Sequence, residues 1–244
     1  VITYNISYEL VGGENNESNP ATYTVEDEDN LKNPTKVGYK FIGWSNYGKI
    51  AKGSTGDVTF TAKYDLIVYK ITYICGSGNN NSSNPTGYTI ESETITLKDA
   101  YYINADFIKW QNADAQITEI PKGSYGDLTL TAVWNQYDVE LQDDGSTFSV
   151  IGLNTSKRDI VIKSTYKNKK VTSIGSSAFD DCSSLKIVLY KGTIEQWKKI
   201  SIDSYNGYLT SAARYYYSES EPALNSEGTA YDGNYWHYDT DGVT

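Results

Sequence analysis

Few side chains in this sequence could carry out nucleophilic or metal chemistry. The chain has one histidine, His237, and two cysteines, Cys75 and Cys182. A Cys–His pair would need His237, and nothing in the spacing of these residues supports one. The Gly-x-Ser-x-Gly turn of a serine nucleophile is absent, and one His with two scattered Cys does not favour zinc. We therefore expect no catalytic residue, no cofactor and no metal, and we expect that the protein is not an enzyme.

Two kinds of motif could instead hold a charged ligand. The phrase Lys-Gly-Ser-x-Gly-Asp occurs at 52–57 and 122–127, but its glycine spacing differs from that of a phosphate-binding loop and a strand-like segment follows it. We interpret both copies as turns in which glycine adopts positive φ. The acidic runs EDEDN (26–30) and DTDG (239–242) could attract Ca²⁺, yet neither completes a calcium-binding loop. Solvated acidic turns are the preferred interpretation.

Aromatic residues are the remaining candidates for ligand contact. They make up 14% of the chain, and most occupy alternate positions of expected strands, where core packing explains them. The runs RYYYS (214–218) and NYWHY (234–238) differ, because consecutive residues of a strand face opposite sides of the sheet. One side could be exposed and contact a sugar or a protein, or neighbouring elements could cover both sides. The candidate contacts are Tyr215, Tyr217, Tyr235 and Trp236.

An internal repeat organises the elements that precede these aromatic runs. KGSTGDVTFTAKY (52–64) returns as KGSYGDLTLTAVW (122–134), with eight of thirteen positions identical. YNISYEL (4–10) likewise matches YKITYIC (69–75). Residues 4–65 and 69–135 are therefore two copies of one module, each opened and closed by an alternating strand. Cys75 stands where the first copy has Leu10, so we expect it to be buried and inert.

This module resembles the Listeria–Bacteroides repeat, also called the internalin B-repeat. The resemblance rests on YNISYELVGG, NPATYTV, NPTKVGYKFIGW and GDVTFTAKY in the first copy. The second copy retains YKITY, SNPTGYT and GDLTLTAVW, but its middle departs, with DAYYINADF in place of PTKVGYKF. The resemblance implies a β-grasp-like fold that occurs in tandem on bacterial surface proteins.

The second half of the chain has a different pattern. YDVELQDDGSTFSVIGLN (137–154) predicts a hairpin that turns at Asp144-Gly145. VTSIGSSAFDDCSSL (171–185) resembles the BspA-like leucine-rich repeat, which would place Cys182 in the interior. We count one clear solenoid turn, although about three are usually needed to bury their faces. A helix capped by Thr193 and Gln196, a tyrosine-rich strand within 208–218 and a last strand within 233–239 would close the domain.

Composition narrows the class of partner. The net charge of −10 and pI near 4.6 would repel phosphate backbones, so we expect no nucleic-acid partner. No apolar run approaches the roughly 18 residues of a membrane span, so we expect no membrane insertion. Neither a secretion signal nor any Met occurs, which predicts a mature or trimmed fragment whose signal and anchor lie elsewhere.

Together these patterns predict a mainly β, β-rich α+β chain of three domains. Two tandem β-grasp-like modules would span 1–67 and 68–136, and a small, truncated leucine-rich-repeat-like domain with a capping segment would span 137–244. Both resemblances imply an extracellular or cell-wall-associated bacterial protein that works in adhesion or as a spacer. Its partner would be a host or bacterial surface protein or glycan. The alternative is a carbohydrate-binding appendage of a larger polysaccharide-degrading enzyme.

Overall fold

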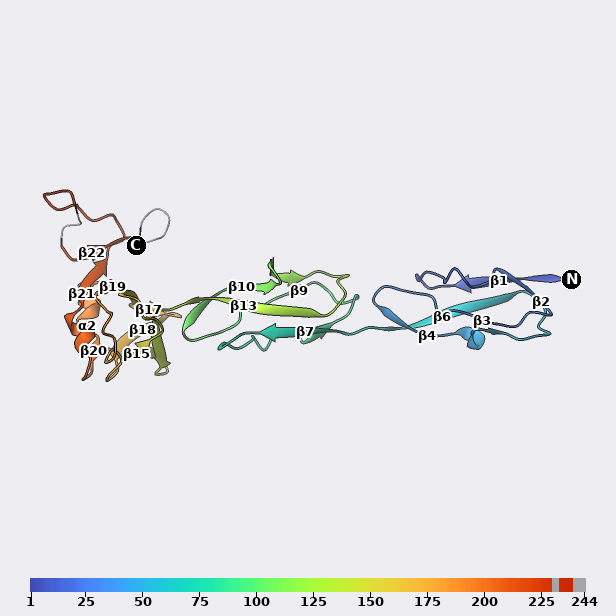
Figure 1. Cartoon of the computed structure of the whole chain (residues 1–244), viewed down its shortest axis with the longest axis horizontal. Coiled ribbons are helices and arrows are strands. Elements are labelled where there is room, and N and C mark those ends of the chain that lie inside the picture. The colour runs from blue at the N-terminus through green and yellow to red at the C-terminus, as the bar shows by residue number, and fades with distance from the viewer. Residues whose placement is uncertain (230–232, 239–244) are drawn as a thin grey trace. The chain divides into compact units, whose positions relative to one another are not determined.

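The computed structural model describes residues 1–229 and 233–238 (Figure 1). Strands account for 45% of the chain and helices for 6%, which confirms the predicted β-rich class. Contacts divide the chain into two compact units. The first consists of Val1–Cys75, Asn80–Asp99 and Lys109–Ala132, and the second of Gly76–Asn79, Ala100–Ile108 and Val133–Thr244.

The first segment of the chain folds around a four-stranded sheet in the order β2-β1-β6-β4. The alternating strands that open and close the segment, β1 and β6, pair in parallel at the centre, and the other two pair antiparallel to them. A short 3₁₀ turn, Ser45–Gly48, follows β4. The strands are β1 (Thr3–Glu9), β2 (Thr22–Thr24), β3 (Asp29–Asn30), β4 (Tyr39–Trp44), β5 (Lys49–Ile50) and β6 (Val58–Leu66).

The next segment has the sheet order β11-β10-β13-β7-β8. Its opening and closing strands, β7 and β13, also pair in parallel. The additional strand β11 forms a hairpin with β10, within the stretch where this segment is longer than the first. The strands are β7 (Tyr69–Ile74), β8 (Gly87–Tyr88), β9 (Ile95–Thr96), β10 (Ala105–Asn112), β11 (Ala115–Ile117), β12 (Glu119–Ile120) and β13 (Leu128–Gln136).

The repeated phrase Lys-Gly-Ser-x-Gly-Asp forms a turn before the last long strand of each segment. Gly56 and Gly126 have φ values of 87° and 94°, a region that favours glycine, so the predicted positive φ is confirmed. The Tyr23 hydroxyl donates to the Gly56 carbonyl at 2.5 Å, and Tyr88 donates to Gly126 at 2.6 Å. A buried tyrosine therefore holds each turn from within the protein.

A second pair of equivalent contacts uses asparagine. The Asn19 amide donates to the Lys32 carbonyl at 3.0 Å, and its oxygen accepts from the Lys32 N–H at 2.6 Å. Asn84 makes the same two bonds with Lys98, at 2.8 and 2.7 Å. In both copies, the asparagine of the repeated Ser-Asn-Pro sequence therefore forms the two main-chain hydrogen bonds that a neighbouring strand would form.

Two series of parallel strands build the remainder of the chain, within the second unit (Figure 1). β15, β18 and β20 form one series, and β16, β19, β21 and β22 form the other. Their inward residues share one core, which includes Phe148, Ile174, Ile160 and Val188, all at most 1% exposed. The elements are β14 (Val139–Asp143), β15 (Thr147–Leu153), β16 (Asp159–Lys163), β17 (Thr165–Tyr166), β18 (Lys169–Ile174), β19 (Ile187–Lys191), α1 (Ile194–Trp197), β20 (Ser201–Ile202), α2 (Gly207–Ser211), β21 (Ala213–Tyr217) and β22 (Tyr235–Trp236).

The structure has more passes between the two series of strands than the one repeat that is clear in the sequence. The chain passes three times from the first series to the second, through β15–β16, β18–β19 and β20–β21. The third pass has no repeat pattern in the sequence, because β20 is two residues long and carries no apolar alternation of its own. The hairpin at Asp144-Gly145 is confirmed by antiparallel β14 and β15. The capping box of Thr193 and Gln196 is also confirmed.

Candidate functional site

The four aromatic candidates lie on the last two strands of the second parallel series. Tyr215 and Tyr217 belong to β21, and Tyr235 and Trp236 belong to β22. Tyr217 stands in register with Trp236, and their ring centroids are 5.0 Å apart. The structure therefore brings Tyr217 and Trp236 together, whereas Tyr215 lies beside a different strand, β19.

Exposure separates these four residues. Trp236 is only 5% exposed, and its indole N–H donates to the Tyr190 carbonyl at 3.1 Å. Its ring is therefore part of the packing and offers no open face to a sugar. Tyr235 is 41% exposed, while Tyr215 and Tyr217 are half-buried. Ligand contact by these side chains stays a prediction.

An apolar row on the outer face of the same sheet was missed by the sequence reasoning. Val161, Leu189 and Tyr215 stand in direct register across β16, β19 and β21, and all three are half-buried. Strand alternation turns them outward, because the neighbours Ile160 and Ile162 are fully buried in the core. The sequence indicates this row because apolar residues stand at consecutive positions of DIVIK and IVLYK, and therefore on both faces of each strand. We call Val161, Leu189 and Tyr215 the outer row.

Cationic side chains border the outer row. Lys163 and Lys191 are paired in register, two residues beyond Val161 and Leu189. The Lys191 ammonium lies 5.4 Å from the centroid of the Tyr217 ring and 4.6 Å from that of Tyr238. An ammonium over an aromatic face is held by the ring quadrupole. The outer face thus combines an apolar strip with a positive charge held over aromatic rings.

Neither cysteine has the surroundings of a reactive thiol. Both are half-buried and outside any disulfide, so the expectation that Cys75 is buried is only partly met; it follows the end of β7, beside the exposed Ile74. Burial raises the pKa of the Cys75 thiol. Burial, together with the nearby Asp181 and Asp180, raises the pKa of Cys182. A thiol with a raised pKa is protonated at neutral pH and is a poor nucleophile.

Charged motifs singled out in the sequence are engaged within the protein. In the acidic run 26–30, Glu28 pairs with Lys49 at 3.0 Å and Glu26 pairs with Lys52 at 3.2 Å. Lys52 begins the first Lys-Gly-Ser-x-Gly-Asp turn, so these ion pairs connect the two motifs. Among the described residues no group of three His, Cys, Asp or Glu could hold a metal. The run DTDG (239–242) lies outside the described residues.

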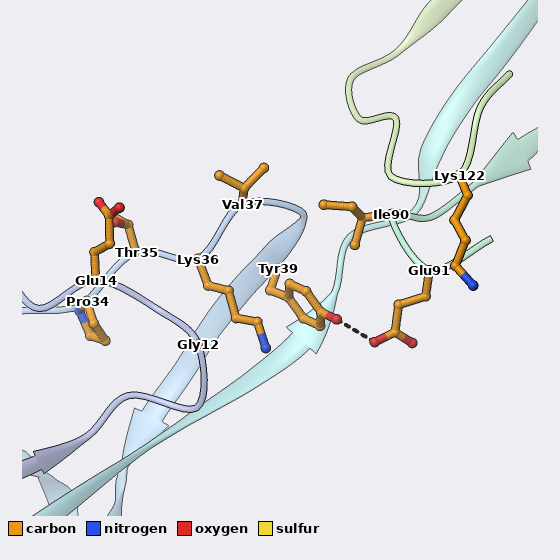
Figure 2. A pocket seen from close by; sticks show the side chains of 10 residues that line it. All are labelled: Gly12, Glu14, Pro34, Thr35, Lys36, Val37, Tyr39, Ile90, Glu91 and Lys122. Atoms are coloured by element: carbon orange, nitrogen blue, oxygen red, sulfur yellow. Dashed lines mark hydrogen bonds between the residues drawn. The ribbon is translucent and has the colours of Figure 1, made fainter. Parts of the chain in front are cut away.

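A hollow of about 970 Å³ lies in the first unit (Figure 2). The Lys36 ammonium donates to a main-chain carbonyl at 2.9 Å and lies 3.9 Å from the centroid of the Tyr39 ring. The Tyr39 hydroxyl donates to Glu91, and Lys122 pairs with Glu93 at 2.6 Å. Because protein partners already engage these groups, the hollow lacks the converging polar groups of a ligand site.

Comparison with known proteins adds no homologue. No family model, curated protein or solved structure matches this chain. In the part of the chain that the structure describes, no helix has the length and apolar character needed to cross a bilayer.

Proposed function

We propose that this chain is a non-catalytic binding and spacing part of a bacterial cell-surface or secreted protein. The partner is a surface protein, which contacts the outer row. In this proposal residues 1–67 and 68–136 are β-grasp-like repeats of the Listeria–Bacteroides type. Residues 137–244 are a small leucine-rich-repeat-like domain whose last strands close the solenoid.

The strand arrangement supports the assignment of the modules. Each of the first two segments pairs its opening strand in parallel with its closing strand, β1 with β6 and β7 with β13. Each also holds its glycine turn with the same tyrosine and its Ser-Asn-Pro segment with the same asparagine. The parallel series of β16, β19, β21 and β22 is the kind of stacking that solenoid repeats require.

The outer row carries the proposal of a protein partner. Aliphatic and tyrosine side chains side by side on a sheet resemble the apolar core of a protein interface, and interface energy concentrates in a few such residues. The alternative, a carbohydrate-binding appendage, would use exposed rings of the two aromatic runs, and the only tryptophan among them, Trp236, is 5% exposed. We therefore favour a protein partner.

A binding panel with matched variants tests this proposal. The purified chain is applied to immobilised host matrix proteins and glycans, and any protein that binds is then measured with Leu189→Thr. We expect Leu189→Thr to weaken binding by about tenfold, as for loss of a central interface contact. Ile42→Thr is the control, because Ile42 is 53% exposed and belongs to β4, which is not a strand of the outer row. Equal effects of the two changes, or binding only to neutral glycans, would contradict the proposal.

A further inference from the structure

A recess of about 290 Å³ lies in the second unit, lined by residues around β17 and β18 and by residues of and after α1. Its lining includes two lysines, Lys170 and Lys199, and the amide side chain of Gln196. Three hydroxyl-bearing residues, Ser164, Thr165 and Thr172, also line it. Among the described residues that line it there is no Asp or Glu. The recess therefore offers mainly hydrogen-bond donors.

Hydrogen-bond donors of this recess are available to a ligand. Neither Lys170 nor Lys199 forms an ion pair among residues 1–229 and 233–238, whereas the nearby Lys169 pairs with Asp143 at 2.7 Å. The charge of Lys199 also acts on the exposed Glu195, whose pKa is lowered mainly by hydrogen bonds and in part by this lysine. The Gln196 side-chain oxygen accepts from the Thr193 N–H at 2.8 Å as part of the helix cap. This bond leaves the Gln196 –NH₂ group available as a donor.

Tyr190 lines the recess from the core side. It is 1% exposed, and its ring packs against Trp197 with centroids 5.0 Å apart. Within the described part of the chain its hydroxyl has no hydrogen-bond partner. Burial, with Tyr216 nearby, raises the pKa of Tyr190 to about 12, so the hydroxyl keeps its proton. The hydroxyl oxygen is not one of the fully buried side-chain atoms that lack a partner, which are those of Tyr64 and Arg214. It therefore reaches the open recess and can donate to a ligand there.

Local charge also favours an anion here. The segment 157–199 holds ten Lys or Arg and four Asp or Glu, a net charge of 10 − 4 = +6, although the whole chain carries −10. Four of these lysines pair with three carboxylates outside the segment, those of Asp106, Asp138 and Asp143. The two lysines of the recess are left to act on a ligand, because a local cluster of one sign attracts counter-ions whatever the net charge.

We propose that this recess binds the oxyanion group of an acidic sugar, either a sulfate ester or a carboxylate. The two ammonium groups neutralise the oxyanion, and the hydroxyl and amide groups bond to its oxygens and to the sugar hydroxyls. The volume of about 290 Å³ is roughly ten times the ~30 Å³ that one water occupies. It has room for one sugar residue, and the proposal does not depend on the outer row.

Titration of the full chain tests the ligand class. We expect saturable amide chemical-shift changes with glucose 6-sulfate or with glucuronate at constant ionic strength, and none with glucose. Comparison of the titration with glucose 6-sulfate and the titration with glucuronate distinguishes a sulfate ester from a carboxylate. Saturation by glucose, or by neither acidic sugar, would overturn the proposal. Inorganic sulfate binding as tightly as glucose 6-sulfate would overturn its sugar component.

Neighbouring lysines provide a matched pair of variants. Lys199→Gln should weaken binding about tenfold, as expected for a lost charge-assisted hydrogen bond. Lys198→Gln removes the same charge from an exposed residue that does not line the recess, and should change affinity less than twofold. Equal losses would show diffuse attraction and overturn the site. Tyr190→Phe, which keeps the ring, should also weaken binding if its fold is intact by thermal melting. An unchanged affinity would remove Tyr190 from the site.

Discussion

At the residue scale, two tyrosines show how a side chain fixes a turn. Tyr23 and Tyr88 are each 4% exposed, and their hydroxyls bond to Gly56 and Gly126 in equivalent turns. We expect Tyr23→Phe and Tyr88→Phe each to lower the free energy of unfolding by about 1 kcal/mol, the typical net value of one hydrogen bond. Urea titration followed by fluorescence measures this loss.

The control for this pair is Tyr47→Phe. Tyr47 is fully exposed, so removal of its hydroxyl should leave the urea midpoint unchanged. If Tyr23→Phe and Tyr88→Phe also left the midpoint unchanged, the two turns would be stabilised by their glycines alone.

At the element scale, the short helix α1 depends on its cap. The Thr193 hydroxyl accepts from the Gln196 N–H at 3.2 Å, and the Gln196 side chain bonds back to Thr193. A helix of four residues is far too short to be stable by itself, so the cap and the buried Trp197 must hold it. We expect Thr193→Ala to destabilise the second unit by about 1 kcal/mol, measured by thermal melting.

The conservative change Thr193→Ser retains an oxygen that can accept the same hydrogen bond. It should therefore retain most of the stability. Equal melting temperatures of Thr193→Ala and the unmodified chain would mean that packing of Trp197, and not the cap, fixes α1.

At the scale of the whole molecule, the second compact unit includes residues 100–108 as well as the residues after 133. Within it, the Asp106 carboxylate accepts from Tyr137 and from Lys163, the latter at 3.2 Å, and pairs with Lys167 at 3.5 Å. Burial acts to raise the pKa of Asp106, but these hydrogen bonds and charges outweigh burial and hold the pKa below its ordinary value of 3.8. The ionised carboxylate therefore stabilises the unit.

The pH dependence of stability tests this cluster. A carboxylate with a lowered pKa contributes its stability above pH 3.8 and loses it as the pH falls through the lower folded value. We expect Asp106→Asn to lower the melting temperature of the second unit at pH 7. The difference from the unmodified chain should persist to about pH 4 and shrink below it. A difference that stays constant down to pH 3 would count against the ionised cluster.

Local patterns in the sequence predicted much of the fold. Strand alternation, the Asp144-Gly145 hairpin and the capping box of Thr193 each depend on residues within a few positions of one another, so short-range physics decides them. The positive φ of Gly56 is equally local. The number of passes through the parallel sheets was not predictable in this way, because a strand as short as β20 is specified by its neighbours.

The sequence by itself determined that this protein is β-rich and that it contains two copies of one repeat. It also showed none of the catalytic motifs considered above. Only the tertiary structure decided which distant side chains share a surface. Val161, Leu189 and Tyr215 become neighbours through strand register, and Trp236 is buried where β22 pairs with β21, with its indole N–H bonded to the Tyr190 carbonyl. Lys170 of β18 and Lys199, which follows α1, line one recess because the fold packs these two elements together. Register between strands many residues apart is set by the packing of the whole core, and no local pattern in the chain encodes it.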